Sequence, residues 1–203
     1  MKALQGSRRI AVQTVLAALA AGTLVVPPLV VAASGTASYS ASWTALRILA
    51  LYALTVLFLN IITGSFRPLL VKVFKPRLLF RLHNTAGIVG FSMAVAHMVL
   101  VIAEGLWPGF QKLGPVALYI FTVTTTVVLL RKYLKRSWRM VHRLNYAVFT
   151  VALIHAFQVG TDLADGGFLT VLLYFYAALV AAGFIYRTQL AIRLHARKKP
   201  AAA

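Results

Sequence analysis

Cysteine is absent from the 203 residues of this sequence, and acidic residues are nearly absent. Without cysteine the chain can form no disulfide, no thiolate-ligated haem and no cysteine-held iron–sulfur cluster. Histidine is then the main candidate for any metal ligand. Only three Asp and Glu residues stand against 21 Lys and Arg, which gives a formal net charge of +18.

Apolar residues, by contrast, are abundant: 61% of the chain is hydrophobic and the mean hydropathy is +0.84. This composition is typical of an integral membrane protein with one membrane domain. Six apolar segments have roughly the 20 residues that cross a hydrocarbon core of about 30 Å. They are 10–33, 43–63, 83–103, 114–131, 141–160 and 168–187. We therefore predict an all-α integral membrane protein, a six-transmembrane-helix bundle that passes repeatedly through the cell membrane in contact with its lipid.

The basic residues are confined to alternate loops. All of the Lys and Arg except Arg47 and Lys112 precede the first span, lie in the second or fourth loop, or follow the last span. The other loops contain Lys112 and the three acids, Glu104, Asp162 and Asp165. Because cytoplasmic loops carry an excess of Lys and Arg, we predict that both termini are cytoplasmic. This topology also explains the net charge, so we expect no nucleic-acid partner.

The first span has two interpretations. We expect a basic cytoplasmic N-terminus over 1–9, a first transmembrane helix over 10–33, a membrane domain over 43–187 and a basic cytoplasmic tail over 188–203. A basic start, an apolar run and the small residues 31–35 also describe a cleavable signal peptide. The apolar run is long for a signal core, however, and Pro27 and Pro28 would kink a retained helix without ending it. We expect residues 198–203 to be disordered.

Four histidines lie in these spans as two evenly spaced pairs. His83 and His97 are fourteen residues apart on one span, and His142 and His155 are thirteen apart on another. At a rise of about 1.5 Å per residue, the separations are about 21 Å and about 19.5 Å. Ionisable side chains in apolar spans are rare and costly, so four of them at matched depths point to a cofactor. We predict two haem groups, with His83 and His142 at the cytoplasmic depth and His97 and His155 toward the outer side.

The first pair lies on one face of its helix. At about 100° per residue, His97 falls within about 40° of His83. The stripe between them contains Gly87, Gly90 and Ala94. Such small residues leave room either for a flat macrocycle or for a closely packed helix. We therefore place Gly87 and Gly90 among the candidate cofactor-binding residues.

The second pair is less regular. Thirteen residues leave His142 and His155 about 140° apart on an ideal helix. A kink, a tightened turn or differently rotated haems would be needed to align them. The stripe that follows His142 is bulkier and could line a porphyrin; it contains Asn145, Tyr146, Phe149 and Ala152.

The histidines have two alternative interpretations besides haem ligation. A single His in a helix is more often a hydrogen-bonded packing residue than a ligand, and His83 and His142 lie near basic loops where water can reach them. Four histidines at paired depths favour the cofactor. Tetrahedral zinc needs three or four converging ligands, whereas these pairs are about 20 Å apart. His195 lies beyond the last span among basic residues, and we expect it to be solvated.

Four arginines cluster at the depth of His83 and His142, namely Arg77, Arg81, Arg139 and Arg143. They could pair with the propionates of the inner haem through charge-assisted hydrogen bonds. Their alternative role is to set orientation against lipid phosphates. We include Arg81 and Arg143 among the candidate cofactor-binding residues.

Two segments resemble the ferric reductase-like transmembrane domain: Arg81-Leu-His83-Asn-Thr-Ala-Gly87 continuing to His97, and Trp138-Arg-Met-Val-His142-Arg-Leu-Asn-Tyr146 continuing to His155. That family includes ferric-chelate reductases, the NADPH oxidases and the haem-binding membrane subunit of the bacterial methionine-sulfoxide reductase system. The resemblance covers roughly residues 43–187, and both histidine spacings and the six-span plan agree with it.

The resemblance implies an oxidoreductase with two b-type haems, one between His83 and His142 and the other between His97 and His155. Electrons would pass from the inside to the outside. Ferric reductases and oxidases usually continue into a flavin and nicotinamide domain, whereas only residues 188–203 follow the last span here. We therefore expect no flavin-binding domain and a separate donor, either a cytoplasmic flavoprotein or a quinol. Ferric chelates, oxygen and a periplasmic reductase all fit as acceptors.

Two other functions are also consistent with the sequence. The haem-binding subunit of a methionine-sulfoxide reductase is similar in size, but that subunit often lacks a histidine matching His83. The full set of four histidines therefore favours the ferric-reductase branch. A cofactor-free channel, transporter or assembly factor belongs to a different class, which a reduced-minus-oxidised optical spectrum would separate from both haem proteins.

Overall fold

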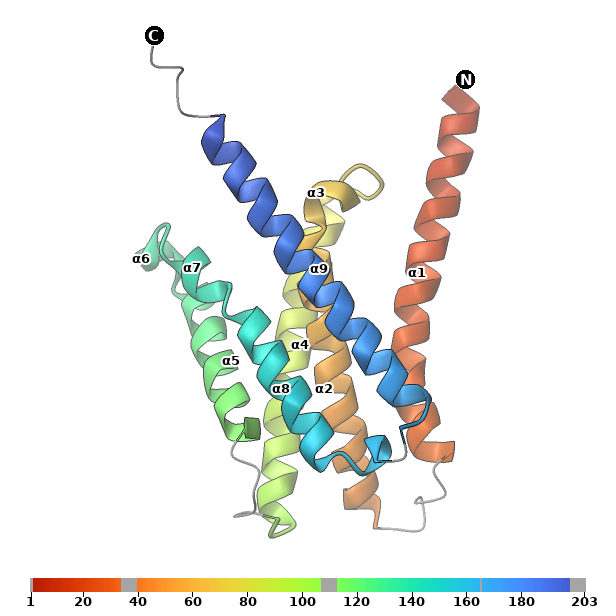
Figure 1. The fold of residues 1–203 in the computed structure, drawn as a ribbon, viewed down its shortest axis with the longest axis vertical. Coiled ribbons are helices and arrows are strands. Elements are labelled where there is room, and N and C mark those ends of the chain that lie inside the picture. The colour runs from red at the N-terminus through yellow and green to blue at the C-terminus, as the bar shows by residue number, and fades with distance from the viewer. Residues whose placement is uncertain (1, 34–39, 107–112, 165, 198–203) are drawn as a thin grey trace.

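The computed structural model describes residues 2–33, 40–106, 113–164 and 166–197 (Figure 1). The predicted all-α architecture is confirmed, because these residues form helices and their connections without any strand. Within this part of the chain, four helices are long and apolar enough to cross a membrane. They are α1 (Lys2–Ala33, with the candidate span Gly6–Ala33), α2 (Ala41–Ser65), α4 (Pro76–Ala103) and α9 (Phe168–Ala196). The membrane character predicted from composition therefore has a structural counterpart.

Shorter helices complete the bundle. They are α3 (Arg67–Leu70), α5 (Leu113–Leu129), α6 (Arg131–Leu134), α7 (Trp138–His142), α8 (Asn145–Val159) and the 3₁₀ turn η2 (Thr161–Leu163). Of these, α5 is apolar but has only 17 residues. At about 1.5 Å per residue it is about 25 Å long, slightly less than the hydrocarbon core.

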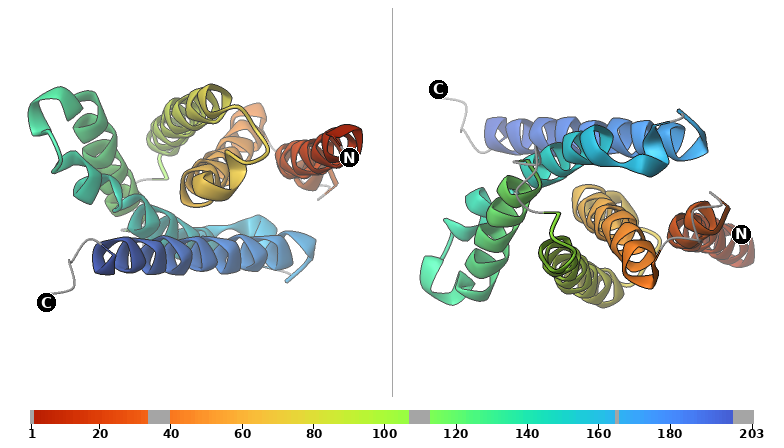
Figure 2. Two further views of the ribbon diagram at one scale, coloured as in Figure 1. Left: turned by 90° about the horizontal axis from the view of Figure 1, so that it is seen from above. Right: turned by 90° about the horizontal axis from the view of Figure 1, so that it is seen from below.

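Helix α2 is the central element and packs against α1, α4, α8 and α9. Its start is fixed by the Ser40 hydroxyl, which accepts a hydrogen bond from the Trp43 amide at 3.2 Å. The helix is buried along most of its length, and Phe58 stacks on Tyr176 of α9 with ring centroids 3.9 Å apart. Helix α1 lies at one edge of the molecule beside α2, and α5 lies toward the opposite edge (Figure 2). Helices α4 and α8, which bear three of the four candidate histidines, are therefore positioned directly against α2.

One end of the bundle gathers the basic segments, and we call it the basic end. The start of α1, the end of α9, and α3, α6 and α7 all lie there (Figure 1). Arg9 and Gln13 of α1 both donate to the Val73 carbonyl at 2.7 Å, which ties α1 to the connection between α3 and α4. Glu104 and Asp162 lie at the opposite end, at the finish of α4 and in η2.

The helix bounds differ clearly from the predicted spans in four places. Helix α1 begins at Lys2, before the predicted start at 10, so it includes residues predicted as a terminus outside the span. Helix α4 begins at Pro76, well before the predicted start at 83, because proline suits the first helical turn. Residues 188–196, predicted as a tail beyond the last span, continue α9. The predicted span 141–160 is broken between α7 and α8. As predicted, Pro27 and Pro28 do not end α1. The predicted disordered end, 198–203, lies outside the described residues.

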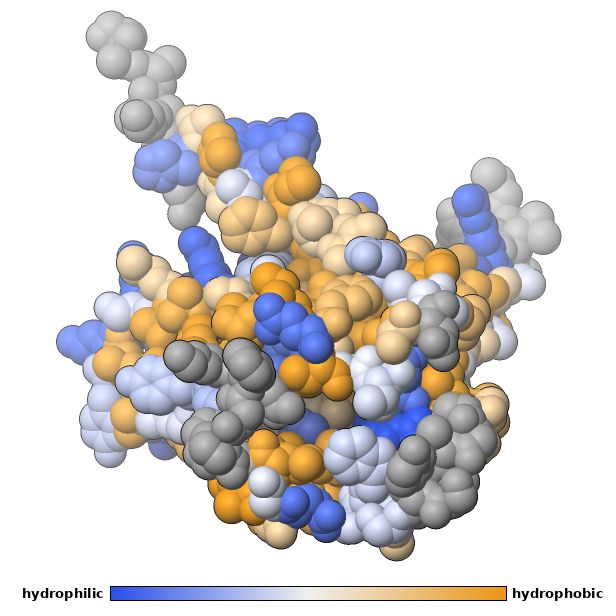
Figure 3. Space-filling view, turned by 60° about the horizontal axis from the view of Figure 1, so that its bottom comes forward, coloured by the Kyte–Doolittle hydropathy of each residue, from blue (hydrophilic) through white to orange (hydrophobic). Residues whose placement is uncertain are grey.

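Large apolar side chains also cover the outside of the bundle. Hydrophobic residues occupy much of the surface in the space-filling view (Figure 3). In the apolar stretches of α1 and α4, only 11% of residues are buried inside the protein. A continuous apolar exterior of this kind is what a helix presents to lipid.

Candidate functional site

Both histidines of α4 are bonded to main-chain carbonyls of α2. His83 Nδ1 lies 3.0 Å from the Asn60 carbonyl oxygen, and His97 Nδ1 lies 3.2 Å from the Leu46 carbonyl oxygen. The two carbonyls are fourteen residues apart on α2, which matches the fourteen residues between the histidines on the antiparallel α4. A carbonyl can only accept, so each Nδ1 carries the proton and donates it. Each Nε2 is then left with its lone pair, the state in which imidazole binds a metal.

The Asn60 side chain makes a second link to the same histidine. Its Nδ2 donates to the His83 main-chain carbonyl at 2.5 Å. A Cβ added at Gly87 would lie 3.3 Å from this nitrogen, so the glycine gives the amide room. Gly90 likewise faces α2, because a Cβ there would lie 3.3 Å from Val56 Cγ1. Of the two roles that the sequence left open for these glycines, the contacts describe close helix packing.

His142 lies opposite His83, at the basic end. Their ring centroids are 5.9 Å apart and the rings are nearly perpendicular, at 83°. A metal bound by two imidazole nitrogens at about 2.0–2.1 Å each, with the rings extending outward from it, has ring centroids roughly 6 Å apart. The Cβ that Gly64 lacks would lie 3.1 Å from His83 Cε1, so this glycine of α2 makes space for the ring. We call His83 and His142 the inner pair.

Hydrogen bonds also surround His142. Asn145 Nδ2 lies 3.4 Å from His142 Nδ1, and Asn145 Oδ1 accepts from the Thr124 hydroxyl at 2.7 Å. That hydroxyl also lies 3.0 Å from the Phe121 carbonyl, so one proton faces two acceptors. Turning the amide by 180° satisfies the whole set: Thr124 donates to Phe121, Asn145 Nδ2 donates to Thr124, and His142 Nδ1 donates to Asn145 Oδ1. In that arrangement His142 Nε2 is also free to bind a metal.

The break between α7 and α8 brings the second pair of histidines closer to one face. Main-chain bonds from Arg143 to Met140, Leu144 to Val141, and Tyr146 to Arg143 all reach three residues back. Such a 3₁₀ stretch turns by about 120° per residue instead of about 100°. Over four residues the extra rotation is about 80°, which reduces the ideal offset between His142 and His155 from about 140° to about 60°. The spacing of thirteen residues requires a kink, a tightened turn or differently rotated haems, and this 3₁₀ stretch is a tightened turn.

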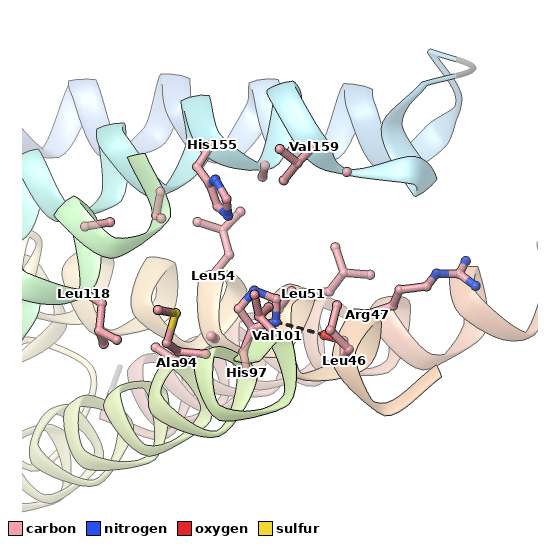
Figure 4. A pocket seen from close by; sticks show the side chains of 18 of the residues that line it. Leu46, Arg47, Leu51, Leu54, Ala94, His97, Val101, Leu118, His155 and Val159 are labelled. Atoms are coloured by element: carbon pink, nitrogen blue, oxygen red, sulfur yellow. Dashed lines mark hydrogen bonds between the residues drawn. The ribbon is translucent and has the colours of Figure 1, made fainter. Parts of the chain in front are cut away.

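His97 and His155 lie at the far end and line one cavity, which has a volume of about 190 Å³. Both side chains point into it, from α4 and α8 respectively (Figure 4). The lining is mostly apolar and includes Trp43, Leu54, Leu118 and Phe121. Typical small-molecule sites have about 300–1,000 Å³, so side chains must move apart before a macrocycle can enter. We call His97 and His155 the outer pair.

The His155 ring is closely enclosed. Its Nδ1 is buried without a hydrogen-bond partner among the described residues. A Cβ added at Gly114 would lie 2.9 Å from both Cε1 and Nε2, so only glycine fits beside the ring without displacing it. Buried polar atoms without partners are uncommon, which sets this nitrogen apart from the bonded Nδ1 atoms of His83 and His97.

The predicted arginines lie outside these contacts. Arg81 and Arg143 are exposed at the basic end, as are Arg77 and Arg139, and the Arg139 guanidinium lies 5.8 Å from the centre of the Trp138 ring. His195 is exposed, as expected. Among the described residues, no group of three or more His, Asp or Glu converges as a metal site. The histidines therefore offer two-ligand sites.

Several residues that position the histidines were not predicted. They are Asn60, Gly64, Gly114 and Thr124. A polar Asn60 within the apolar span 43–63 is the one clear sequence signal among them. Comparison with known protein families, with curated proteins and with solved structures finds no match to this chain.

Proposed function

We propose that this protein is a di-haem b-type membrane cytochrome that passes electrons across the cell membrane, in the manner of the ferric reductase-like family. The observation that carries the proposal is the inner pair, whose rings face each other from α4 and α7 with centroids 5.9 Å apart. An axial pair of imidazoles at this separation is suited to one iron between them.

Three further observations support haem as the group that these residues hold. Both α4 histidines donate through Nδ1, which leaves Nε2 for iron. At the outer pair, glycine at position 114 lets the His155 ring lie against α5, and the buried His155 Nδ1 has no hydrogen-bond partner among the described residues. The donor set consists of two histidines per site, which fits haem and falls short of tetrahedral zinc.

In this proposal, the residues of the chain bind the two haems, orient them and keep water away from them. His83, His142, His97 and His155 are the proposed axial ligands. Helix α2 fixes the tautomer of the two α4 histidines through the Asn60 and Leu46 carbonyls. Apolar residues around the cavity keep water away from the outer pair. Haem, when bound, supplies the one-electron chemistry.

The topology is part of the same proposal. We place the basic end in the cytoplasm, with both termini there and six spans formed by α1, α2, α4, α5, the α7–α8 unit and α9. Electrons then enter near the inner pair, from a cytoplasmic flavoprotein or a quinol. They leave near the outer pair, to a ferric chelate, oxygen or a periplasmic reductase.

Substitution of single histidines tests the assignment. His83→Ala and His142→Ala should each remove the inner haem, whereas His97→Ala and His155→Ala should each remove the outer one. His195→Ala is the matched control, because this exposed histidine lies outside both pairs. Haem content and redox titration are measured for each purified variant. The pairing is wrong if His97→Ala and His155→Ala affect different haems, and the haem assignment is wrong if His195→Ala is as damaging as the other four.

A further inference from the structure

A buried ion pair joins α2 to η2 at the outer end of the bundle. Arg47 Nε donates to Asp162 Oδ2 at 2.9 Å, and Arg47 Nη2 donates to Asp162 Oδ1. The two side chains are only 5% and 6% exposed. A bidentate pair of this kind fixes the direction as well as the distance of its partners.

The two ends of this ion pair adjoin the two outer histidines. Arg47 directly follows Leu46, whose carbonyl accepts from His97 Nδ1. Asp162 is seven residues after His155, in the turn that follows α8. Consecutive residues of α2 therefore hold α4 at His97 and the end of α8 beyond His155. Arg47 and Asp162 also belong to the lining of the cavity that His97 and His155 line.

We propose that Arg47 and Asp162 are positioning residues that set the separation of His97 and His155, and that the outer haem depends on them while the inner haem does not. This inference rests on the proposed function. His155 has the greatest need of such support, because its Nδ1 has no hydrogen-bond partner among the described residues. The inner pair is oriented instead by Asn60 and Asn145, at the other end of the bundle.

The test must avoid leaving one buried charge alone, since that can prevent folding. The main variant is therefore the double substitution Arg47→Leu with Asp162→Leu, because replacing both members of a buried pair with apolar residues is commonly tolerated. Arg47→Lys keeps the charge but loses the two-point geometry. Glu104→Gln is the matched control, since it removes an exposed acid at the same end of the bundle.

The purified full-length variants are examined for haem per chain, optical spectrum and midpoint potentials, with the inner haem as an internal measure of folding. In the double variant we expect haem to fall from about two per chain to about one, with the inner signature unchanged. Arg47→Lys should retain both haems with a shifted outer potential only. Glu104→Gln should match the wild type.

Two results would overturn the inference while leaving the proposed function intact. The double variant could keep both haems with unchanged potentials, or it could lose both together, which would assign the ion pair to the whole fold. A wild-type protein that binds no haem would instead overturn the proposed function, and this inference with it.

Discussion

Asn60 and His83 are bonded to each other in both directions. The Asn60 carbonyl accepts from His83 Nδ1 at 3.0 Å, and the Asn60 amide donates to the His83 carbonyl at 2.5 Å. The first bond fixes the tautomer and orientation of the His83 ring. The second fixes the position of α4 along α2. A single residue of α2 thereby controls both the tautomer and the location of a proposed ligand.

Replacing the Asn60 amide should weaken the inner site more than the outer one. Asn60→Leu removes the side-chain donor and keeps the carbonyl, so we expect a loss of about 1 kcal/mol in the free energy of unfolding. Gly87→Ala should have a similar effect, because its methyl group would crowd the same amide. Ser92→Ala, an exposed substitution on α4, is the control. Denaturation midpoints and inner haem content measure the effect, and equal losses at both sites would contradict it.

Adding a side chain at Gly114 should empty the outer site. The new Cβ would lie 2.9 Å from His155 Cε1 and Nε2, closer than such contacts permit, so the ring must move. We expect Gly114→Val to retain about one haem per chain. Gly22→Ala is the control, because a Cβ at Gly22 of α1 meets open space. Unchanged outer haem in Gly114→Val would mean that the His155 ring has another orientation when it binds iron.

The hydrogen-bonded set behind His142 should affect the inner haem. Without the Asn145 acceptor, His142 Nδ1 loses its partner, so Asn145→Leu should reduce the inner site's affinity for haem roughly 10–100-fold. Thr124→Val should act in the same direction, since the hydroxyl orients the Asn145 amide. Thr122→Val is its control, because that exposed hydroxyl bonds only within its own helix. Haem titration of the purified variants would refute this role if Thr124→Val and Thr122→Val behave alike.

The basic end should be cytoplasmic. A reporter fused after residue 203 should be active in the cytoplasm, because the short loops at that end contain nearly all of the Lys and Arg. A reporter inserted between α4 and α5 should be active on the opposite side of the membrane. The reverse pattern would invert both the topology and the proposed direction of electron flow.

The sequence predicts the elements of this fold better than their contacts. Hydropathy and length place the long helices. The matched histidine separations predict that His83 and His142 share one depth, because a separation along a helix follows from its rise per residue. The partner of His83 on α2 cannot be predicted in this way. It depends on the register of α4 against α2, which is determined by the packing of Gly87 and Gly90 against α2.

The sequence left open whether the segment between His142 and His155 has a tightened turn, and it could not place the break at residues 143–144, for a physical reason. Neither proline nor glycine marks it, and the sequence there, Arg-Leu-Asn, is compatible with a continuous helix. The three-residue hydrogen bonds form where α7 meets α5, so tertiary packing outweighs local preference. Arg47 lies inside the predicted span 43–63, but its partner Asp162 is 115 residues away and only the fold brings the two together.

The haem content of the purified wild-type protein tests the central claim most directly. The protein, expressed with sufficient haem and extracted from membranes, is assayed for haem per chain and for its reduced-minus-oxidised optical spectrum. We predict about two haems per chain with b-type, low-spin spectra, since four histidines supply two axial pairs. A haem content near zero would contradict the account and favour a cofactor-free transporter or assembly factor, in which the histidines serve only to join α2, α4, α7 and α8.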